Sequence, residues 1–293
     1  MKLIDGKKIA AEIKEEIKKE VSEMIDNDLD GPHLAAVLVG EDPASQTYVK
    51  SKEKACREAG IISSIYNLPE NTTQKELLET IDFLNNDPEV DGFIVQLPLP
   101  GHIDEDTVIQ QIRPEKDVDG FHPVNIGRMV LGLPAYISAT PFGILKLIER
   151  SGIETEGKHC VVVGRSNIVG TPVSILLSRK SKTGNATVTL CHSKTKDLEE
   201  ITKTADILIA AIGKKEFIKA DMVKKNAAVI DVGIHRVPSD KTKSGYRLVG
   251  DVDFNEVSKV AGHITPVPGG VGPMTIVSLL NNTLMAARKE IYS

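Results

Sequence analysis

A tyrosine and a lysine stand four residues apart in the first third of the chain. Tyr48 and Lys52 lie in segment 43–59, which the sequence predicts to be helical, so this spacing places both side chains on one helix face. A lysine ammonium in a partly dry site is a titratable group that can serve proton transfer. Two plainer interpretations stay open, because most surface lysines are solvated charges and many tyrosines are half-buried packing residues.

Polar residues also interrupt or follow the next apolar run. Gln96 stands near the end of 93–97, a predicted strand, and such a run rarely contains an amide. In open α/β sheets, ligands bind beyond the carboxyl ends of the strands, so this position suits a ligand contact. Asp117 and Asp119 follow in Pro114–Gly120, where ordinary turn chemistry is the alternative explanation.

A glycine-containing turn follows a valine-rich strand in the second half of the chain. Gly164–Gly170 reads Gly-x-Ser-x-x-x-Gly and lies between the predicted strand His159–Val163 and a predicted helix. Backbone N–H groups at such a turn, with the helix dipole, favour an anion. The spacing departs from Gly-x-Gly-x-x-Gly, so the motif alone also fits a plain turn of an α/β sheet.

The residues after the next strand indicate which nucleotide would bind. NAD sites usually place an acidic residue there, bonded to the ribose 2′-hydroxyl. Here the predicted strand Thr187–Cys191 is followed by Ser193, with no acidic residue, and Arg165 stands in the glycine turn. An arginine and a hydroxyl suit a 2′-phosphate, which favours NADP over NAD. The alternative is that Ser193 caps a helix.

The elements that must position these residues alternate between strands and helices. This alternation predicts parallel βαβ units and an α/β fold with two domains. Segment 113–134 is predicted to be a loop that crosses between the domains. The Gly- and Pro-rich stretch 266–275 suits close backbone approach to a ligand, or a hinge. The helices are predicted at 7–25, 43–59, 73–86, 140–152, 169–179, 198–205 and 273–291, and the strands at 34–39, 61–68, 93–97, 159–163, 187–191, 207–212 and 228–232.

The composition excludes several classes of protein. Lys and Arg total 36 against 41 Asp and Glu, and this net charge of −5 argues against a protein that coats nucleic acid. No apolar run reaches membrane-spanning length, and the N-terminus lacks the apolar core of a signal peptide. The 3 cysteines are far apart and match neither a disulfide framework nor a metal site. We therefore expect a cytoplasmic protein without a membrane partner or a metal.

Five motifs together carry a resemblance to a known family. They are Tyr48–Lys52, Val95–Leu99, Pro114–Gly120, Gly164–Gly170 and Pro268–Thr275, and they span nearly the whole chain in order. With them the chain resembles the bifunctional methylenetetrahydrofolate dehydrogenase/methenyltetrahydrofolate cyclohydrolases. The resemblance implies NADP-dependent oxidation of 5,10-methylenetetrahydrofolate and hydrolysis of the methenyl product to 10-formyltetrahydrofolate, a step of one-carbon metabolism. It also implies a homodimer.

The resemblance further implies how the domains divide the work. A folate-binding, catalytic domain would comprise 1–139 plus 270–293, a Rossmann-like NADP-binding domain would comprise 140–269, and the active-site cleft would lie between them. Lys52 would be the acid/base of the hydrolysis, and Gln96 would bond and tune it. Tyr48 would stack on the folate, and Asp119 would bond the pterin ring. These four are the implied catalytic residues.

The remaining implied contacts concern substrate and cofactor. Arg165 and Ser193 would hold the NADP phosphate, and Ile234 would line the adenine or ribose side. Two rival interpretations are a shikimate-type NADP dehydrogenase, which leaves Gln96 unexplained, and a redox sensor that binds NADP without turnover. The implied substrate-binding residues are Tyr48, Val49, Lys50, Ser51, Lys52, Val95, Gln96, Leu97, Asp119, Pro268, Gly269, Gly270, Val271, Gly272, Pro273, Met274 and Thr275, and the implied cofactor-binding residues are Gly164, Arg165, Ser166, Ser193 and Ile234.

Overall fold

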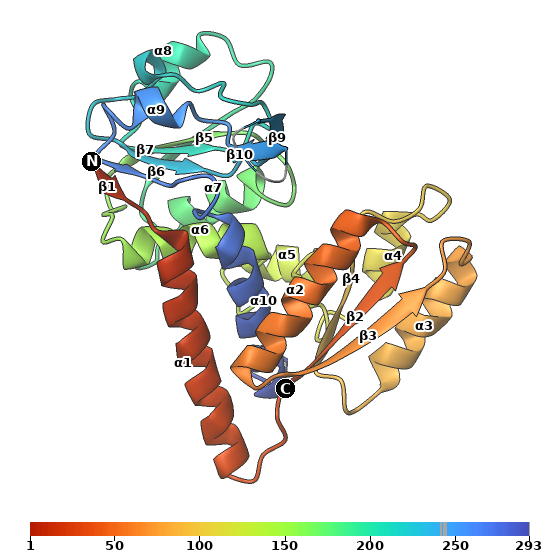
Figure 1. Cartoon of the computed structure of the whole chain (residues 1–293). Helices are drawn as coiled ribbons and strands as arrows, with labels where there is room; N and C mark the ends of the chain where they lie inside the picture. The colour runs from red at the N-terminus through yellow and green to blue at the C-terminus, as the bar shows by residue number, and fades with distance from the viewer. Residues whose placement is uncertain (241, 243–244, 293) are drawn as a thin grey trace. The chain divides into compact units, whose positions relative to one another are not determined.

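A computed structural model describes residues 1–240, 242 and 245–292 (Figure 1). The chain divides into two compact units, unit 1 with residues 1–10 and 140–275, and unit 2 with residues 11–139 and 276–293. Both units are α/β, with parallel strands joined by helices, as the alternating sequence pattern predicts.

Unit 2 is built on a parallel sheet of 3 strands in the order β3-β2-β4. One face of β2 packs on α3 through alternate residues, as a pleated strand requires. The other face of the sheet packs against α2 (Figure 1). These elements are β2 (His33–Val39), α2 (Pro43–Ala59), β3 (Ile62–Leu68), α3 (Gln74–Asn86) and β4 (Gly92–Val95).

The ends of α2 and α3 follow from local chemistry that the sequence displays. The Asp42 carboxylate accepts the N–H of Ser45 at 2.7 Å, and Pro43 occupies the first turn of α2. Gly60 ends α2 in the left-handed conformation, with φ 78°. Thr73 and Glu76 form a reciprocal capping box at the start of α3. The predicted bounds of α2 are confirmed, and α3 begins one residue later than predicted because Thr73 is its N-cap.

The prediction of a crossing loop over 113–134 is wrong. This stretch lies within unit 2 and contains α5 (Pro123–Leu131), and a further helix, α4 (Glu105–Gln111), precedes it. His122 caps α5 by accepting the N–H of Val124 at 3.1 Å, and Gly132 ends it with φ 74°. Proline at the first helical position and glycine after the last one are helix boundaries here, not signs of a loop.

Unit 1 contains a parallel sheet of 6 strands in the order β1-β11-β8-β7-β5-β6. The chain moves outward from β5 in both directions, which is the doubly wound pattern of nucleotide-binding folds. The strands are β1 (Lys2–Leu3), β5 (His159–Val163), β6 (Thr187–Cys191), β7 (Ile207–Ala210), β8 (Ala228–Asp231) and β11 (His263–Ile264). The helical elements are α6 (Ala139–Arg150), α7 (Gly170–Ser178), α8 (Leu198–Thr202), η1 (Ala220–Met222) and α9 (Phe254–Val257).

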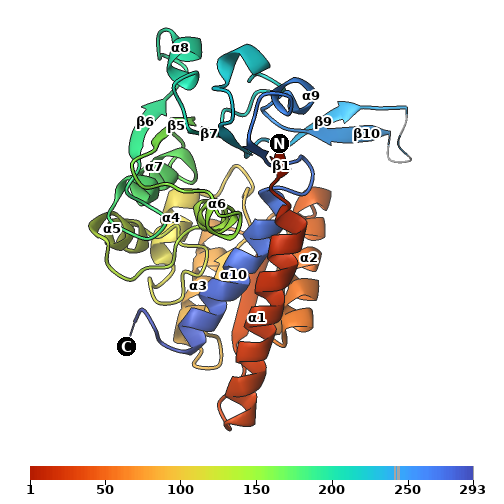
Figure 2. The same ribbon diagram turned by 90° about the vertical axis from the view of Figure 1, so that its left-hand side faces the viewer.

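Several elements of unit 1 have no counterpart among the predictions. β9 (His235–Pro238) and β10 (Tyr246–Val249) form an antiparallel pair that extends away from the sheet (Figure 2). β1 pairs with β11, and this pairing places the first ten residues in unit 1 instead of with 11–139. Residues 270–275 also fall in unit 1, so the two units differ from the expected domain bounds at both places.

One long helix lies near the start of the chain and another lies near its end. They are α1 (Gly6–Asp26) and α10 (Gly272–Ala287), and α10 ends four residues earlier than the predicted Ile291. Within the residues that the structure describes, each helix is too short or too polar to cross a membrane.

Candidate active site

Unit 2 brings Tyr48, Lys52 and Gln96 together. The Lys52 Nζ donates to Gln96 Oε1 at 3.2 Å and lies 5.4 Å from the centroid of the Tyr48 ring. The four-residue spacing on α2 places lysine and tyrosine side by side, as predicted. Tyr48 is 46% exposed, so part of its side chain reaches solvent beside Lys52.

The backbone fixes the orientation of the Gln96 amide. Its Nε2 donates to the Leu97 carbonyl at 2.6 Å, which leaves Oε1 directed at Lys52. β4 ends at Val95, so the predicted strand over 93–97 is two residues too long and Gln96 follows the strand instead of ending it. The connections after β2 and β4 lead to opposite faces of the sheet, because α2 packs on one face and α4 packs beside α3 on the other. Gln96 therefore lies at the point where an open sheet binds its ligand.

The two aspartates of the third motif have different surroundings. Asp119 is half-buried; burial raises the pKa of its carboxyl, and the nearby charge of Lys52 opposes that shift. Asp117 is 1% exposed, and burial raises its pKa to about 7 although hydrogen bonds to its carboxylate oppose the shift. Asp119 is thus the aspartate that shares an environment with Lys52.

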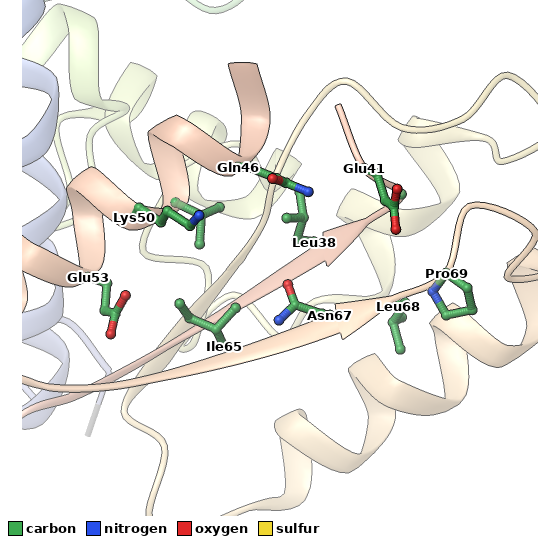
Figure 3. Close-up of a pocket in the computed structure, with 11 residues that line it drawn as sticks. Leu38, Glu41, Gln46, Lys50, Glu53, Ile65, Asn67, Leu68 and Pro69 are labelled. Atoms are coloured by element: carbon green, nitrogen blue, oxygen red, sulfur yellow. The ribbon is translucent and has the colours of Figure 1, made fainter. Parts of the chain in front are cut away.

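The other predicted residues of this helix do not all face Lys52. Val49 and Lys50 line a cavity of about 560 Å³ on another flank of α2, with Ile65 and Asn67 of β3 on its opposite wall (Figure 3). Val49 is buried, as is Val95 at the end of β4. The Ser51 hydroxyl donates to the carbonyl of Thr47. Within segment 48–52, Lys52 is the residue that contacts both Gln96 and the Tyr48 ring.

Unit 1 shapes the glycine turn for close approach of an anion. A Cβ at Gly164 would lie 2.0 Å from the Ala211 carbonyl oxygen, and one at Gly170 would lie 1.8 Å from the Gly164 carbonyl oxygen. Only glycine fits at both ends of this turn. The Ser166 hydroxyl accepts the N–H groups of Val169 and Gly170 at 3.2 and 3.4 Å. The geometry fits the phosphate-binding turn of a dinucleotide site.

The other predicted cofactor residues follow strands that end at the same edge of the sheet. Arg165 is exposed in the turn after β5, Ser193 is exposed just after β6, and Ile234 is 60% exposed after β8. The N-cap of α8 is Asp197, which leaves Ser193 outside the capping position. A guanidinium and a hydroxyl beyond parallel strands are groups that would hold a phosphorylated ribose.

Matches to known families decide between the interpretations. Residues 4–119 match the catalytic domain of tetrahydrofolate dehydrogenase/cyclohydrolase, and residues 138–291 match the NAD(P)-binding domain of the same enzyme. The chain belongs to the tetrahydrofolate dehydrogenase/cyclohydrolase family. This membership confirms the resemblance, the enzyme class and the fold class that the sequence predicts, and it decides against a shikimate-type dehydrogenase.

Individual members of the tetrahydrofolate dehydrogenase/cyclohydrolase family agree over the full length. Bifunctional protein FolD of Porphyromonas gingivalis is 57% identical over 287 residues, which cover 98% of this chain and 97% of that protein. The crystal structure of the bifunctional FolD enzyme from Campylobacter jejuni has a TM-score of 0.92 at 50% identity and 99% coverage of both chains. The Trypanosoma brucei enzyme, solved with NADP cofactor and inhibitor, has a TM-score of 0.91 at 39% identity, covering 99% of this chain and 98% of that one.

A cavity in unit 1 brings together a residue predicted to contact the cofactor and a motif predicted to contact the substrate. It has a volume of about 130 Å³ and is lined by Ile234 and by the motif segment Pro268–Pro273. Lys7 and Asp231 also line it, and neither is among the site residues that the sequence predicts. Asp231 ends an apolar strand, the same kind of signal that identified Gln96, whereas nothing local distinguishes Lys7 from its neighbours.

The last two residues of that motif have structural contacts of their own. Met274 is fully buried, and a Cβ at Gly143 would lie 2.6 Å from its Cβ. The Thr275 hydroxyl donates to the Gly272 carbonyl at 2.8 Å within the first turn of α10. The motif therefore has two roles: it forms the tightly packed start of α10, and it lines the cavity.

Proposed function

We propose that the chain oxidises 5,10-methylenetetrahydrofolate with NADP and hydrolyses the methenyl product to 10-formyltetrahydrofolate. The observation that carries the proposal is the Lys52–Gln96 hydrogen bond beside Tyr48 and Asp119, within a chain that matches both family domains. These are an acid/base, its partner, a stacking ring and a carboxylate acceptor.

The oxidation needs orientation more than proton transfer. NADP supplies the hydride acceptor when it is bound. The chain's own contribution is to hold the folate, with the Tyr48 ring stacked on it and the Asp119 carboxylate accepting hydrogen bonds from the pterin. The glycine turn, Arg165 and Ser193 hold the dinucleotide. Proximity of the two reactants then accounts for the rate.

The hydrolysis needs a group that moves protons, and Lys52 is the group in position. Water adds to the methenyl carbon and gives up one proton, which leaves a neutral hydroxyl adduct. That hydroxyl then loses its proton as the C–N5 bond breaks and N5 takes up a proton, so N10 keeps the formyl group and one proton is released overall. The fixed Oε1 of Gln96 accepts one N–H of the Lys52 ammonium. This hydrogen bond sets the directions of the other two N–H groups of the ammonium.

A coupled assay tests the proposed function. Enzyme, NADP and methylenetetrahydrofolate should give NADPH absorbance together with a methenyl absorbance that rises and then decays. A redox sensor would bind NADP without either signal. NADPH formation with methenyl decay no faster than in buffer would leave only the dehydrogenase.

The NADP preference gives a prediction at Arg165. Arg165→Ala should raise the KM for NADP about ten- to a hundredfold, because a charge-assisted phosphate contact contributes roughly 1.5–3 kcal/mol. The KM for NAD, which lacks the phosphate, should change little and is the internal control. Steady-state kinetics with both nucleotides measures the effect. A native enzyme that prefers NAD would contradict the assignment of Arg165 and Ser193.

We also propose that the enzyme is a cytoplasmic homodimer, as the family resemblance implies. Light scattering coupled to size-exclusion chromatography should give twice the chain mass of 31.8 kDa. A mass equal to one chain at micromolar concentration would reject the dimer.

A further inference from the structure

The backbone just before Asp119 is held by a residue of the final helix. Asn282 of α10 is 2% exposed, and its Nδ2 donates to the carbonyls of Val118 and Ile137 at 2.8 and 3.0 Å. Each of the two amide hydrogens thus has its own acceptor. Asn282 joins the Asp119 turn to the segment at Ile137, although it lies more than 160 residues away from that turn in the chain.

A second set of side chains holds the other side of the same turn. The Asp117 carboxylate accepts the N–H of His122 at 2.8 Å and Nδ2 of Asn125 at 2.9 Å. The Tyr292 hydroxyl donates to Asn125 Oδ1 at 2.8 Å. These contacts form a relay, Tyr292–Asn125–Asp117, that runs from the C-terminal segment to the residue two before Asp119.

The turn itself has little room to adjust. Gly120 has φ +71°, and a Cβ there would lie 2.7 Å from the Tyr136 carbonyl oxygen. Val118 is fully buried. Asp119 is therefore the half-buried residue of a turn whose neighbours are buried or fixed.

We propose that Asn282, with the Tyr292–Asn125–Asp117 relay, is a positioning residue that sets the place of the Asp119 carboxylate for the folate ring. This inference rests on the proposed function, because it needs Asp119 to bind the pterin. Loss of the Asn282 amide leaves two buried carbonyls without their donor, and the turn shifts to find others. A displacement of about 1 Å in a binding group is enough to weaken an oriented contact.

The test is a double-mutant cycle with Asp119. Asn282→Ala should raise the KM for methylenetetrahydrofolate about tenfold and leave the KM for NADP within about twofold. Asn282→Ala combined with Asp119→Ala should be no worse than Asp119→Ala alone, because the first change acts through the second residue. If the double variant shows the product of the two single effects on the folate KM, the proposal is overturned.

A matched control separates positioning from general loss of stability. Asn85 is also a buried asparagine of unit 2, at 4% exposure, and its side chain joins the Gln111 carbonyl and the Arg113 N–H at 2.8 and 2.9 Å. Asn85→Ala should lower the melting temperature to a similar degree and leave the folate KM near native. An equal rise in folate KM for Asn85→Ala would make Asn282 merely structural and overturn the proposal.

Tyr292→Phe keeps the test decisive if Asn282→Ala does not fold. It retains the ring, which packs on Tyr136 and Arg128, and removes only the hydroxyl of the relay. The folate KM should rise about twofold in the Asp119 background and not at all in the Asp119→Ala background. An unchanged KM in both backgrounds overturns the proposal. The native enzyme is assayed first, so a failure of the proposed function is recognised by inactivity before any variant is compared.

Discussion

Replacing Lys52 by methionine is expected to lower the cyclohydrolase rate by about 10²–10⁴, the usual contribution of a positioned acid/base. The side chain keeps its length and loses the ammonium that donates to Gln96 at 3.2 Å. The dehydrogenase should fall much less, because hydride transfer needs no proton from the protein. Methenyl product should therefore accumulate, and its absorbance after mixing enzyme, NADP and methylenetetrahydrofolate is the measurement.

A matched lysine on the same helix controls for the loss of charge. Lys54 is 72% exposed at its side chain and pairs with Glu58 at 3.8 Å, a surface ion pair that contributes little to stability. Lys54→Met should leave both activities near native. If Lys52→Met clears the methenyl compound at the native rate, Lys52 is a solvated charge and the functional interpretation of the α2 face fails.

Local signals predicted the elements that carry this site. Asp42, Pro43 and Gly60 mark both ends of α2, and the four-residue spacing then places Tyr48 beside Lys52. These features were readable because each depends on neighbours within one or two helical turns. The orientation of the Gln96 amide could not be predicted from the sequence. It depends on a hydrogen bond to the Leu97 carbonyl, and the position of that carbonyl is set by the backbone path after β4.

Features that depend on distant pairing were missed for the same reason. Strand β1 has two residues, Lys2 and Leu3, and exists because it lies beside β11, some 260 residues later. The positions of Asn282 and Tyr292 next to the Asp119 turn are equally non-local. A short strand or a lone buried amide gives no periodic signal, so the sequence alone cannot place it.

Glycine and proline mark the ends of a helix in one segment where a loop is predicted. Richness in Gly, Pro and Asp and weak periodicity predict a loop over 113–134, yet Pro123 begins α5 and Gly132 ends it. Buried Asn125 and Met129, four residues apart, form the inner face of that helix. Its short length leaves too few apolar repeats for periodicity to outweigh composition.

Gly164→Ala is expected to lower the dehydrogenase activity and spare the cyclohydrolase activity, whereas Lys52→Met mainly lowers the cyclohydrolase activity. The added Cβ would lie 2.0 Å from the Ala211 carbonyl oxygen, and φ is +124°, so the turn after β5 must move. Losing about two charge-assisted contacts to the dinucleotide, at roughly 1.5 kcal/mol each, corresponds to about a hundredfold rise in the KM for NADP. The dehydrogenase should fall accordingly.

Gly157→Ala is the control that separates the steric clash at Gly164 from backbone strain. Both glycines have positive φ, but their surroundings differ. Gly157 also has positive φ, +69°, but a Cβ there meets nothing within 4 Å, and it precedes β5 at the opposite edge of the sheet. It should cost about 1–2 kcal/mol of stability and leave the KM for NADP unchanged. Cyclohydrolase activity on added methenyltetrahydrofolate, measured without nucleotide, should stay near native in both glycine variants. Loss of both activities in Gly164→Ala, with Gly157→Ala intact, would show that the turn supports the whole unit and not the dinucleotide alone.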